Sequence, residues 1–342
     1  MFVFALVLVL GACRASPPSA HGPVRGALPS VEVMSCVDVP CSDPRSHELS
    51  GLAWDPAERV LYAISDRTPW IVVLAPREDL SGYELRDPIR LDLPVEHWDG
   101  EALALAGDRF LLVADETDQA VFSVPKDGRG GTRLALPRFA GVRHNLGLEG
   151  LSYVASASGR YVIAVNEQAL EGDGPISSVE HGTVVRLLRH SLDGGADLEV
   201  AYLTDPVFAA GRRGDNGVSD VVAVSSDVVL VLERGWVEGS GNSARLYEVD
   251  LRTAQNVLGL ADARAAVPIA KRLVVDLAQV PDERCPPSSQ RQRRRTLENY
   301  EGMALGPALA DGRRVLFLVA DDNAHAMQDV RVLALAIAAS SL

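Results

Sequence analysis

One short pattern recurs five times along this 342-residue chain, and it constrains the fold more than any other feature. Each copy begins with an acidic residue, continues with small and apolar residues, and turns at a polar pair such as Asp55-Pro56 or Gly107-Asp108. A second apolar run then ends at another polar or acidic residue. The five copies begin at Glu48, Glu101, Glu149, Asp220 and Glu301. Two short apolar runs on either side of a turn-forming pair predict a β-hairpin.

The spacing of the hairpins predicts a β-propeller. A further strand is expected after each hairpin, and helical periodicity is scarce along the chain. The first acids lie 53, 48, 71 and 81 residues apart, and units of about 40 to 50 residues with four strands are typical of propeller blades. We therefore predict an all-β propeller of five to seven blades, with insertions or a degenerate extra blade within 251–298. A β-sandwich or barrel is the alternative fold.

The two ends of the chain are expected to meet. The strand-like run at 31–37 has no hairpin partner of its own. We expect it to join the blade formed by the C-terminus and so to close the ring. Residues 31–342 are then a single propeller domain.

Residues 1–12 are expected to form a signal peptide that ends at Cys13. Residues 1–10 are almost wholly apolar, but a bilayer span needs about 20 residues. The small residues Gly11 and Ala12 before Cys13 resemble the lipobox of bacterial lipoproteins, in which the cysteine carries a diacylglycerol. The segment has no Lys or Arg, so an ordinary signal peptide or a misassigned start is the alternative. We expect an exported protein, anchored by lipid to the outer membrane or cell surface, with 13–30 as a flexible tether.

Three cysteines remain in the exported part, namely Cys36, Cys41 and Cys285. An oxidising compartment favours a disulfide. Cys36 and Cys41 can close a small loop that leaves Cys285 free, or the N-terminal segment can be tied to Cys285. The spacing alone does not choose between these pairings.

Hairpin geometry places the repeated acids at one end of the propeller. In an antiparallel hairpin, the start of the first strand lies beside the end of the second, and each copy of the repeat has polar or acidic residues at both places. If the first strand of each blade is innermost, these carboxylates surround the mouth of the central channel. The set is Glu48, Asp66, Glu101, Asp115, Glu116, Glu149, Glu167, Asp220, Glu233, Glu301, Asp321 and Asp322.

So many carboxylates in one mouth repel one another by more than about 1 kcal/mol for each close pair. Raised pKa values, the nearby cations Arg67 and Arg234, or a bound metal must offset this repulsion. Oxygen ligands without Cys or paired His favour hard cations, Ca²⁺ above all. The expected ligands are Glu48, Asp66, Glu101, Asp115, Glu167, Glu233 and Asp322. The alternative for each acid is a structural role in capping backbone N–H groups of its own blade.

The same segments resemble a known bacterial family, the "esterase-like activity of phytase" family. The similar motifs are 49–55 with 61–66, 147–152, 232–235 with 246–250, and 299–307 with 311–323. The resemblance spans about 46–337, and it implies an exported protein that hydrolyses phosphate monoesters or other esters. Because one fold carries many activities, the family label supplies an expectation about function and no more.

The acidic mouth and the resemblance together imply a mechanism. Bound Ca²⁺ would accept phosphate oxygens and activate a water for attack on phosphorus, with a carboxylate or His as acid or base. The expected catalytic residues are Glu149, Glu301, Asp321 and His144, and further histidine candidates are His47, His97 and His325. The expected substrate-binding residues are Arg67, Arg234 and Asn323, with Arg143 as a further phosphate clamp.

Charge narrows the range of partners. The formal net charge is −13, which disfavours nucleic acid, and the basic run at 291–295 lacks interleaved aromatic residues and is expected to be a solvated loop. The chain has no G-x-S-x-G, H-E-x-x-H or P-loop motif. We expect a monomer that acts on a small-molecule ester or phosphate ester and meets the membrane only through its anchor. The alternatives are a non-catalytic envelope propeller that binds a ligand or protein partner, and a sugar-lactone hydrolase.

Overall fold

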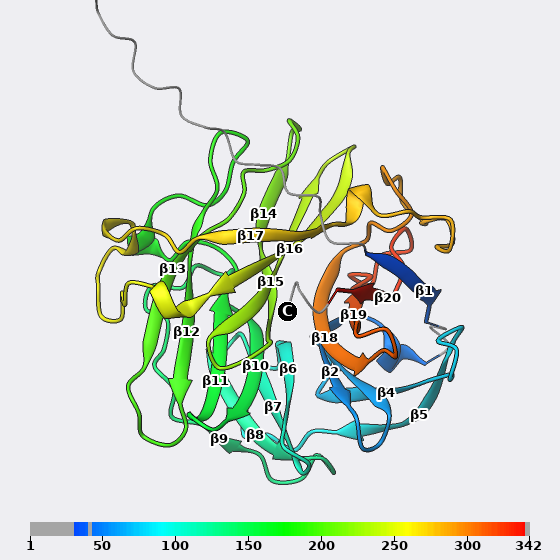
Figure 1. Ribbon diagram of the computed structural model, residues 1–342, viewed down its shortest axis with the longest axis horizontal. Coiled ribbons are helices and arrows are strands. Elements are labelled where there is room, and N and C mark those ends of the chain that lie inside the picture. The colour runs from blue at the N-terminus through cyan, green and yellow to red at the C-terminus, as the bar shows by residue number, and fades with distance from the viewer. Residues whose placement is uncertain (1–30, 40–42, 339–342) are drawn as a thin grey trace, which may run out of the picture.

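A computed structural model describes residues 31–39 and 43–338, which form five antiparallel four-stranded sheets arranged as the blades of a propeller (Figure 1). Blade 1 contains β2 (Leu49–Asp55), β3 (Val60–Ser65), β4 (Trp70–Pro76) and β5 (Tyr83–Arg90). Blade 2 contains β6 (Gly100–Ala106), β7 (Phe110–Asp115), β8 (Ala120–Pro125) and β9 (Thr132–Arg133). Blade 3 contains β10 (Leu148–Ser156), β11 (Gly159–Asn166), β12 (Val184–Ser191) and β13 (Leu198–Leu203). Blade 4 contains β14 (Gly214–Ala223), β15 (Val228–Val237), β16 (Gly241–Asp250) and β17 (Lys271–Asp276).

Blade 5 is built from both ends of the described chain. It contains β18 (Tyr300–Ala308), β19 (Arg314–Ala320), β20 (Arg331–Ile337) and, as its outer strand, β1 (Glu32–Asp38). The strands β1 and β20 pair antiparallel, with Cys36 opposite Leu333. The predicted closure of the ring by the N- and C-terminal strands is therefore confirmed.

Two further contacts hold this closure. Cys36 of β1 forms a disulfide with Cys285, and their Cα atoms are 4.8 Å apart. The side chain of Arg331 is fully buried, with its Nε 2.6 Å from a carboxylate oxygen of Asp38 and its Nη1 3.1 Å from Glu298. Of the two pairings left open by the sequence, the structure has the one that ties the N-terminal segment to Cys285.

The number of blades is five, and 251–298 holds an insertion instead of an extra blade. This segment supplies only β17, the outer strand of blade 4, together with short 3₁₀ turns and loops. The turns of the described chain are η1 (Pro44–Ser46), η2 (Glu171–Asp173), η3 (Leu251–Thr253), η4 (Ala263–Ala265) and η5 (Leu277–Gln279).

The small residues of the repeat let the innermost strands approach one another closely. The strands β2, β6, β10, β14 and β18 contact one another in cyclic order around the channel. A Cβ atom on Gly302 would lie 2.1 Å from the carbonyl oxygen of Ser50, and one on Gly51 would lie 2.4 Å from the backbone nitrogen of Leu103. Glycine is therefore required where the backbone of one blade presses on the next.

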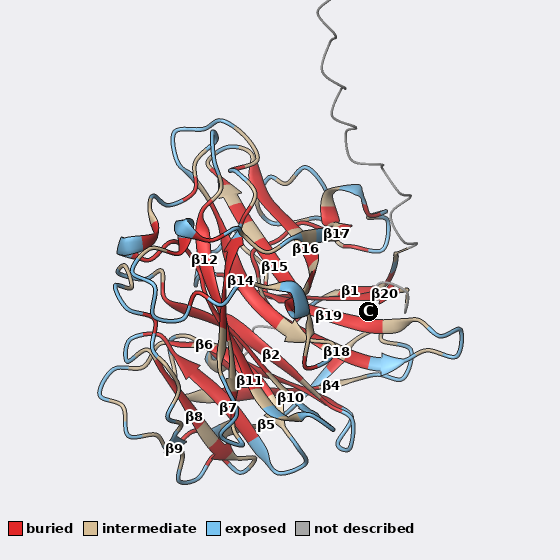
Figure 2. Ribbon diagram, turned by 60° about the vertical axis from the view of Figure 1, so that its left-hand side comes forward, coloured by how far each residue is buried: buried red, intermediate tan, exposed pale blue. Residues whose placement is uncertain are grey.

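Apolar side chains fill the space between neighbouring blades. The strands of the blades are accordingly buried along much of their length (Figure 2). Each middle strand has a neighbour on both of its faces, so β19 is buried along nearly its whole length. Between blades 1 and 5, Trp54 packs on Phe317 with ring centroids 5.5 Å apart. Burial on both faces explains why the strands appear in the sequence as continuous apolar runs.

Several expectations fall on residues outside the described ranges. These are the signal peptide at 1–12, the lipidation site Cys13, the tether at 13–30, and Cys41. Within the described ranges, no helix has the length and apolar character needed to span a membrane.

Candidate functional site

A β-bulge in the first strand of each blade positions the glutamates of the repeat. The pairing register shifts by one residue at Glu101 in β6, Glu149 in β10 and Glu301 in β18. Ser50 and Ser219 lie at the corresponding shifts in β2 and β14. A bulge re-aims the extra side chain, and the three glutamates line the central cavity described below.

A second ring of side chains comes from the position opposite the residue two before the bulge, which directly follows the second strand in blades 1, 2, 3 and 5. In four blades this residue is acidic, and its backbone N–H donates to the carbonyl of the residue two positions before the bulge. The acids are Asp66, Glu116, Glu167 and Asp321, whose N–H groups donate to Glu48, Asp99, Gly147 and Asn299. In blade 4 the corresponding residue is Arg234, paired with Gly217.

The sequence repeat was aligned on the first acid of each copy, and this alignment was wrong in blades 1 and 4. Glu48 corresponds to Asp99, two residues before the bulge, and not to Glu101. Asp220 follows the bulge residue Ser219 by one position. The buried Asp220 carboxylate accepts N–H groups from its own blade and from the neighbouring strands β10 and β18, with Met303 at 2.7 Å. Asp220 therefore has a structural role, because its carboxylate links the inner strands of blades 3, 4 and 5.

A polar cavity of about 580 Å³ lies at this end of the channel. Its acidic lining residues are Asp66, Asp99, Glu101, Glu149, Glu167, Asp215, Glu301 and Asp321. Among the described lining residues, Arg234 is the only Arg or Lys. Trp236 and the amides of Asn145, Gln290 and Asn323 also face the cavity. The predicted acidic mouth is present, and it combines excess carboxylate with a few neutral polar groups.

Arg234 neutralises one side of the cavity. Its Nη2 lies 3.3 Å from Oε1 of Glu301 and 3.5 Å from Oε1 of Glu167, and its Nη1 lies 3.8 Å from Oδ1 of Asp215. Burial opposes the charged guanidinium, but these three carboxylates outweigh it and raise the pKa of Arg234. The cation is therefore fixed in blade 4, and no other Arg or Lys in the described part of the chain lines the cavity.

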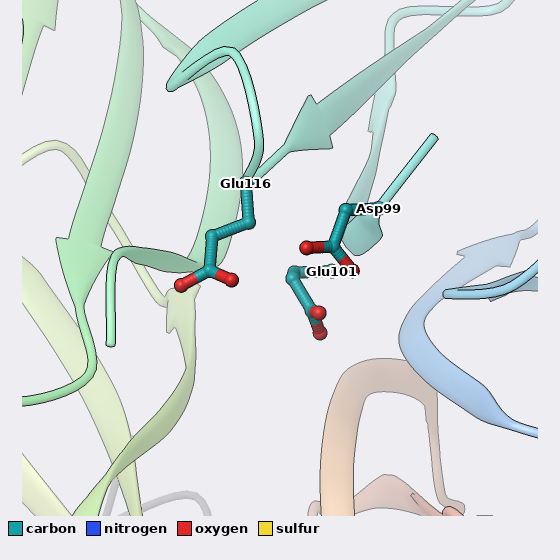
Figure 3. Close-up of side chains that lie close together, drawn as sticks. All are labelled: Asp99, Glu101 and Glu116. Carbon is teal, nitrogen blue, oxygen red and sulfur yellow. The ribbon is translucent and has the colours of Figure 1, made fainter. Parts of the chain in front are cut away.

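Three carboxylates of blade 2 form a candidate cation site. Oxygen atoms of Asp99, Glu101 and Glu116 all lie within 4.8 Å of one another (Figure 3). The Glu116 carboxylate is held in place because it also accepts the N–H of Gly147. Three carboxylates at this spacing fit a hard divalent cation such as Ca²⁺.

Burial and mutual repulsion raise the pKa values of the cavity acids. Burial, followed by the charges of Glu48 and Glu301, raises the pKa of Asp66 to about 7. Burial likewise raises the pKa of Glu116 to about 7, and that of Glu167 to about 7 despite Arg234. The pKa values of Glu101, Glu149 and Asp321 are also raised, first by burial and then by neighbouring carboxylates. Protons or a cation must therefore offset the negative charge at neutral pH.

The structure brings most of the predicted site residues together. The predicted catalytic residues Glu149, Glu301 and Asp321, the substrate-binding residues Arg234 and Asn323, and the ligands Asp66, Glu101 and Glu167 line the central cavity. His144 lines an adjoining hollow, which shares Asp99 and Asn145 with the cavity and also contains Glu116.

Other predicted ligands and one predicted substrate-binding residue face elsewhere. Asp115 caps the backbone N–H groups of Asp99 and Asp118. Glu233 is buried against Tyr202 and Lys271.

Glu48 is bound to Arg67, whose side chain is two-thirds exposed. Asp322 is bound to His47 and to the backbone of Glu48 and Ala324. Because these carboxylates already have partners outside the cavity, we do not count Glu48, Asp115, Glu233 or Asp322 among the candidate metal ligands.

Two acids of the cavity were missed by sequence reasoning. Asp99 lies two residues before the bulge, where the other blades have Glu48, Gly147, Gly217 or Asn299, so this position shows no common acid. Asp215 lies on the part of β14 that extends beyond the bulge toward the cavity. Glu116 was recognised in the acidic ring but not as a ligand. The sequence did contain a feature that indicates this role, because Glu116 is the acid directly after the second strand, at the position of Asp66, Glu167 and Asp321 in other blades.

Five blades around a channel that opens into an acidic cavity define a β-propeller with a candidate functional site at one end of the channel. The family model described as "Phytase-like: Esterase-like activity of phytase" matches residues 44–324, and the chain belongs to this family. The resemblance found in the sequence is thus confirmed. A comparison with curated proteins found no match.

Solved structures of low sequence identity also align with this chain. Glutaminyl cyclase from Myxococcus xanthus is 14% identical, with 89% of this chain and 95% of that chain covered and a TM-score of 0.43. The PQQ-bound aldose sugar dehydrogenase from Streptomyces coelicolor is 14% identical, with 91% and 99% covered and a TM-score of 0.42. A streptogramin B lyase is 9% identical, with 88% and 97% covered and a TM-score of 0.39.

Proposed function

We propose that this protein is an exported hydrolase of phosphate esters or other esters that requires a divalent cation at Asp99, Glu101 and Glu116, with Ca²⁺ as the first choice. The observation that carries this proposal is the convergence of three carboxylates, away from Arg234, where the central cavity meets the adjoining hollow. Membership of the phytase-like family supports hydrolysis as the reaction class.

Charge supports the need for a cation and limits the substrate. The carboxylates of the cavity would repel an anionic phosphate, and Arg234 is the one described Arg or Lys of the lining that would attract it. A bound divalent cation would supply the positive charge that neutralises the triad and polarises the phosphate group. We infer that esters with a single phosphate suit this cavity better than polyphosphates, because each added phosphate would need a further cation.

The residues of the cavity divide into binding and proton-transfer roles. Arg234, held by Glu167, Asp215 and Glu301, would bind a phosphate oxygen as a fixed cation. Asn323 would donate a hydrogen bond from its side chain at the cavity wall.

Glu149 and Asp321, whose pKa values are raised by burial, would exchange protons with the substrate or with water. His144, near the triad, would assist from the adjoining hollow.

Export is part of the proposal. The Cys36–Cys285 disulfide supports an oxidising compartment. A lipid anchor at Cys13 remains a prediction from the sequence, as does the monomeric state.

The test is hydrolysis of p-nitrophenyl phosphate and p-nitrophenyl acetate by the mature protein across a Ca²⁺ titration. We expect turnover that rises with Ca²⁺ and falls at least about a hundredfold in Glu101→Gln, since the triad would lose one charge. Glu58→Gln, an exposed glutamate in the β2–β3 turn, is the matched control and should behave as wild type. Binding of Ca²⁺ without turnover of either ester would support the non-catalytic propeller instead.

A further inference from the structure

A second cavity lies beside the acidic one. It has a volume of about 510 Å³, and His325 and Gln328 line both cavities. Asp321 faces the central cavity, whereas the next residue, Asp322, faces this side pocket. The two cavities therefore meet at the segment that follows β19, which contributes lining residues to both.

The side pocket contains a histidine oriented by a buried carboxylate. The Nδ1 atom of His47 lies 2.5 Å from Oδ2 of Asp322. The other oxygen of Asp322 accepts the N–H groups of Glu48 at 3.0 Å and Ala324 at 3.3 Å. The Asp322 side chain is 7% exposed and that of His47 is 35% exposed. This network assigns the Nδ1 proton to the bond with Asp322.

The outer nitrogen of this histidine is available for chemistry. Among the described residues, Nε2 of His47 has no hydrogen-bond partner, and His47 lines the side pocket. A histidine that donates Nδ1–H to a carboxylate can carry and release a proton at Nε2, because the carboxylate stabilises the imidazolium.

The backbone around the dyad is strained. Glu48, Asn323 and Ala324 have φ angles of 53°, 47° and 44°, in the left-handed region that non-glycine residues rarely adopt. Two of these residues donate the N–H groups that fix Asp322. Strain of this kind persists where surrounding contacts enforce it, and it clusters at functional sites.

We propose that His47 is the general acid that protonates the leaving group of the ester, and that the side pocket holds the alcohol part of the substrate. This inference rests on the proposed function and adds a catalytic residue and a substrate class to it. Asp322 is the positioning residue. In the step, the oxygen of a water forms a bond to phosphorus and the ester P–O bond breaks. The leaving oxygen takes the proton from Nε2 of His47. The proton of the attacking water passes to a carboxylate of the central cavity, and His47 regains a proton from solvent.

The lining of the side pocket defines the alcohol. Val39, Pro44, Ala324, Ala326 and Val330 provide an apolar wall. The charged and titratable groups that face His47 across the pocket are Asp38, Glu48, Asp322, Asp329 and His325. An alcohol that is partly apolar and carries no negative charge fits this lining, because a second anionic group would meet these carboxylates.

The experiment compares two phosphate esters that differ in their need for a proton. The p-nitrophenolate ion leaves without protonation, whereas the alkoxide from benzyl phosphate does not. With saturating Ca²⁺, His47→Gln should lower kcat/KM for benzyl phosphate by about a hundredfold or more, and that for p-nitrophenyl phosphate by less than about threefold. Asp322→Asn, which keeps the shape of the side chain, should show the same selectivity with a smaller loss. His181→Gln, in an exposed loop, is the matched control and should leave both rates unchanged.

The outcomes separate this inference from the proposed function. If wild type hydrolyses p-nitrophenyl phosphate but His47→Gln and Asp322→Asn lose activity equally on both esters, or lose none, the role of His47 is overturned and the hydrolase proposal stands. If wild type hydrolyses neither phosphate ester, the role of His47 is overturned, and the hydrolase proposal is overturned too only if p-nitrophenyl acetate is not hydrolysed either. A selective loss in both variants, with melting temperatures close to wild type, supports a general acid in the side pocket.

Discussion

The Nη2 atom of Arg234 lies 3.3 Å from Oε1 of Glu301, across the junction of blades 4 and 5. Arg234 occupies the position at which the other four blades have an acid. One blade thus supplies the cation that lets the carboxylates of the others share a buried cavity.

Removal of this cation should destabilise the fold. Arg234→Met would leave Glu167 and Glu301 buried without their partner, and breaking a buried ion pair from one side costs about 3–5 kcal/mol. The free energy of unfolding in urea at pH 7 should fall by that amount. The double variant Arg234→Met/Glu301→Gln should recover part of the loss, because one of the unpaired charges is removed. Equal stability of Arg234→Met and wild type would show that the guanidinium does not neutralise these acids.

Stability should depend on pH and Ca²⁺ together. Burial raises the pKa values of Asp66, Glu116 and Glu167 to about 7, from 3.8 for Asp and 4.5 for Glu. Between about pH 5 and 7 the folded protein therefore binds more protons than the unfolded chain, so raising the pH lowers the free energy of unfolding. Without divalent cations, Tm should fall from pH 5 to pH 8.

Added Ca²⁺ should weaken this trend, because the cation competes with protons for Glu101 and Glu116, two carboxylates of the triad whose pKa values are raised by burial. Differential scanning calorimetry at pH 5 and pH 8 should show a larger Ca²⁺-induced rise in Tm at pH 8. An equal rise at both values would argue against binding to the protonated acids of the cavity.

The sequence predicted the hairpins, the third strands and the ring closure because each depends on local apolar runs and on a repeated unit. It left the number of blades open, since 251–298 has no repeat that separates an insertion from a blade. Glu101, Glu149, Glu301, Asp66, Glu167 and Asp321 were placed in the mouth because acids recur at both ends of the hairpin.

The errors in the site arise from register. A bulge shifts the pairing by one residue, and sequence spacing does not reveal it. Asp115 and Glu233 precede Glu116 and Arg234 by one position, so the alternation of side chains turns them away from the cavity. Asp215 reaches the cavity because β14 extends beyond its apolar run, and the apolar pattern of the sequence does not predict this extension.

Close packing of the inner strands can be tested with one methyl group. In Gly302→Ala the new Cβ would lie 2.1 Å from the carbonyl oxygen of Ser50, so blades 1 and 5 must separate, at a cost of about 3 kcal/mol. Gly82→Ala is the matched control, because the nearest atoms to its Cβ would be those of the flexible Arg77 side chain, from 3.5 Å. Chemical denaturation should show a large loss for Gly302→Ala and a small change for Gly82→Ala. Comparable stability of the two variants would contradict the close approach of the blades.

The disulfide should connect distant parts of the chain. Cys36 and Cys285 are separated by 249 residues, and closing a loop of that length in the unfolded state stabilises the native state by about 5 kcal/mol in the chain-entropy model. Peptide mapping without reduction should yield a Cys36–Cys285 cross-linked pair, and Cys36→Ser/Cys285→Ser should unfold at a lower temperature. Recovery of a Cys36–Cys41 peptide would overturn this connectivity.

Isothermal titration of the mature protein with Ca²⁺ at pH 8, for wild type and Asp99→Asn, measures directly whether the triad binds the cation. We expect binding by wild type and an affinity at least about tenfold weaker in Asp99→Asn, since the triad loses one charged ligand. Asp108→Asn, an exposed aspartate at the turn between β6 and β7, should bind as wild type. Absence of Ca²⁺ binding by wild type, or unchanged affinity in Asp99→Asn, would contradict a cation site at Asp99, Glu101 and Glu116.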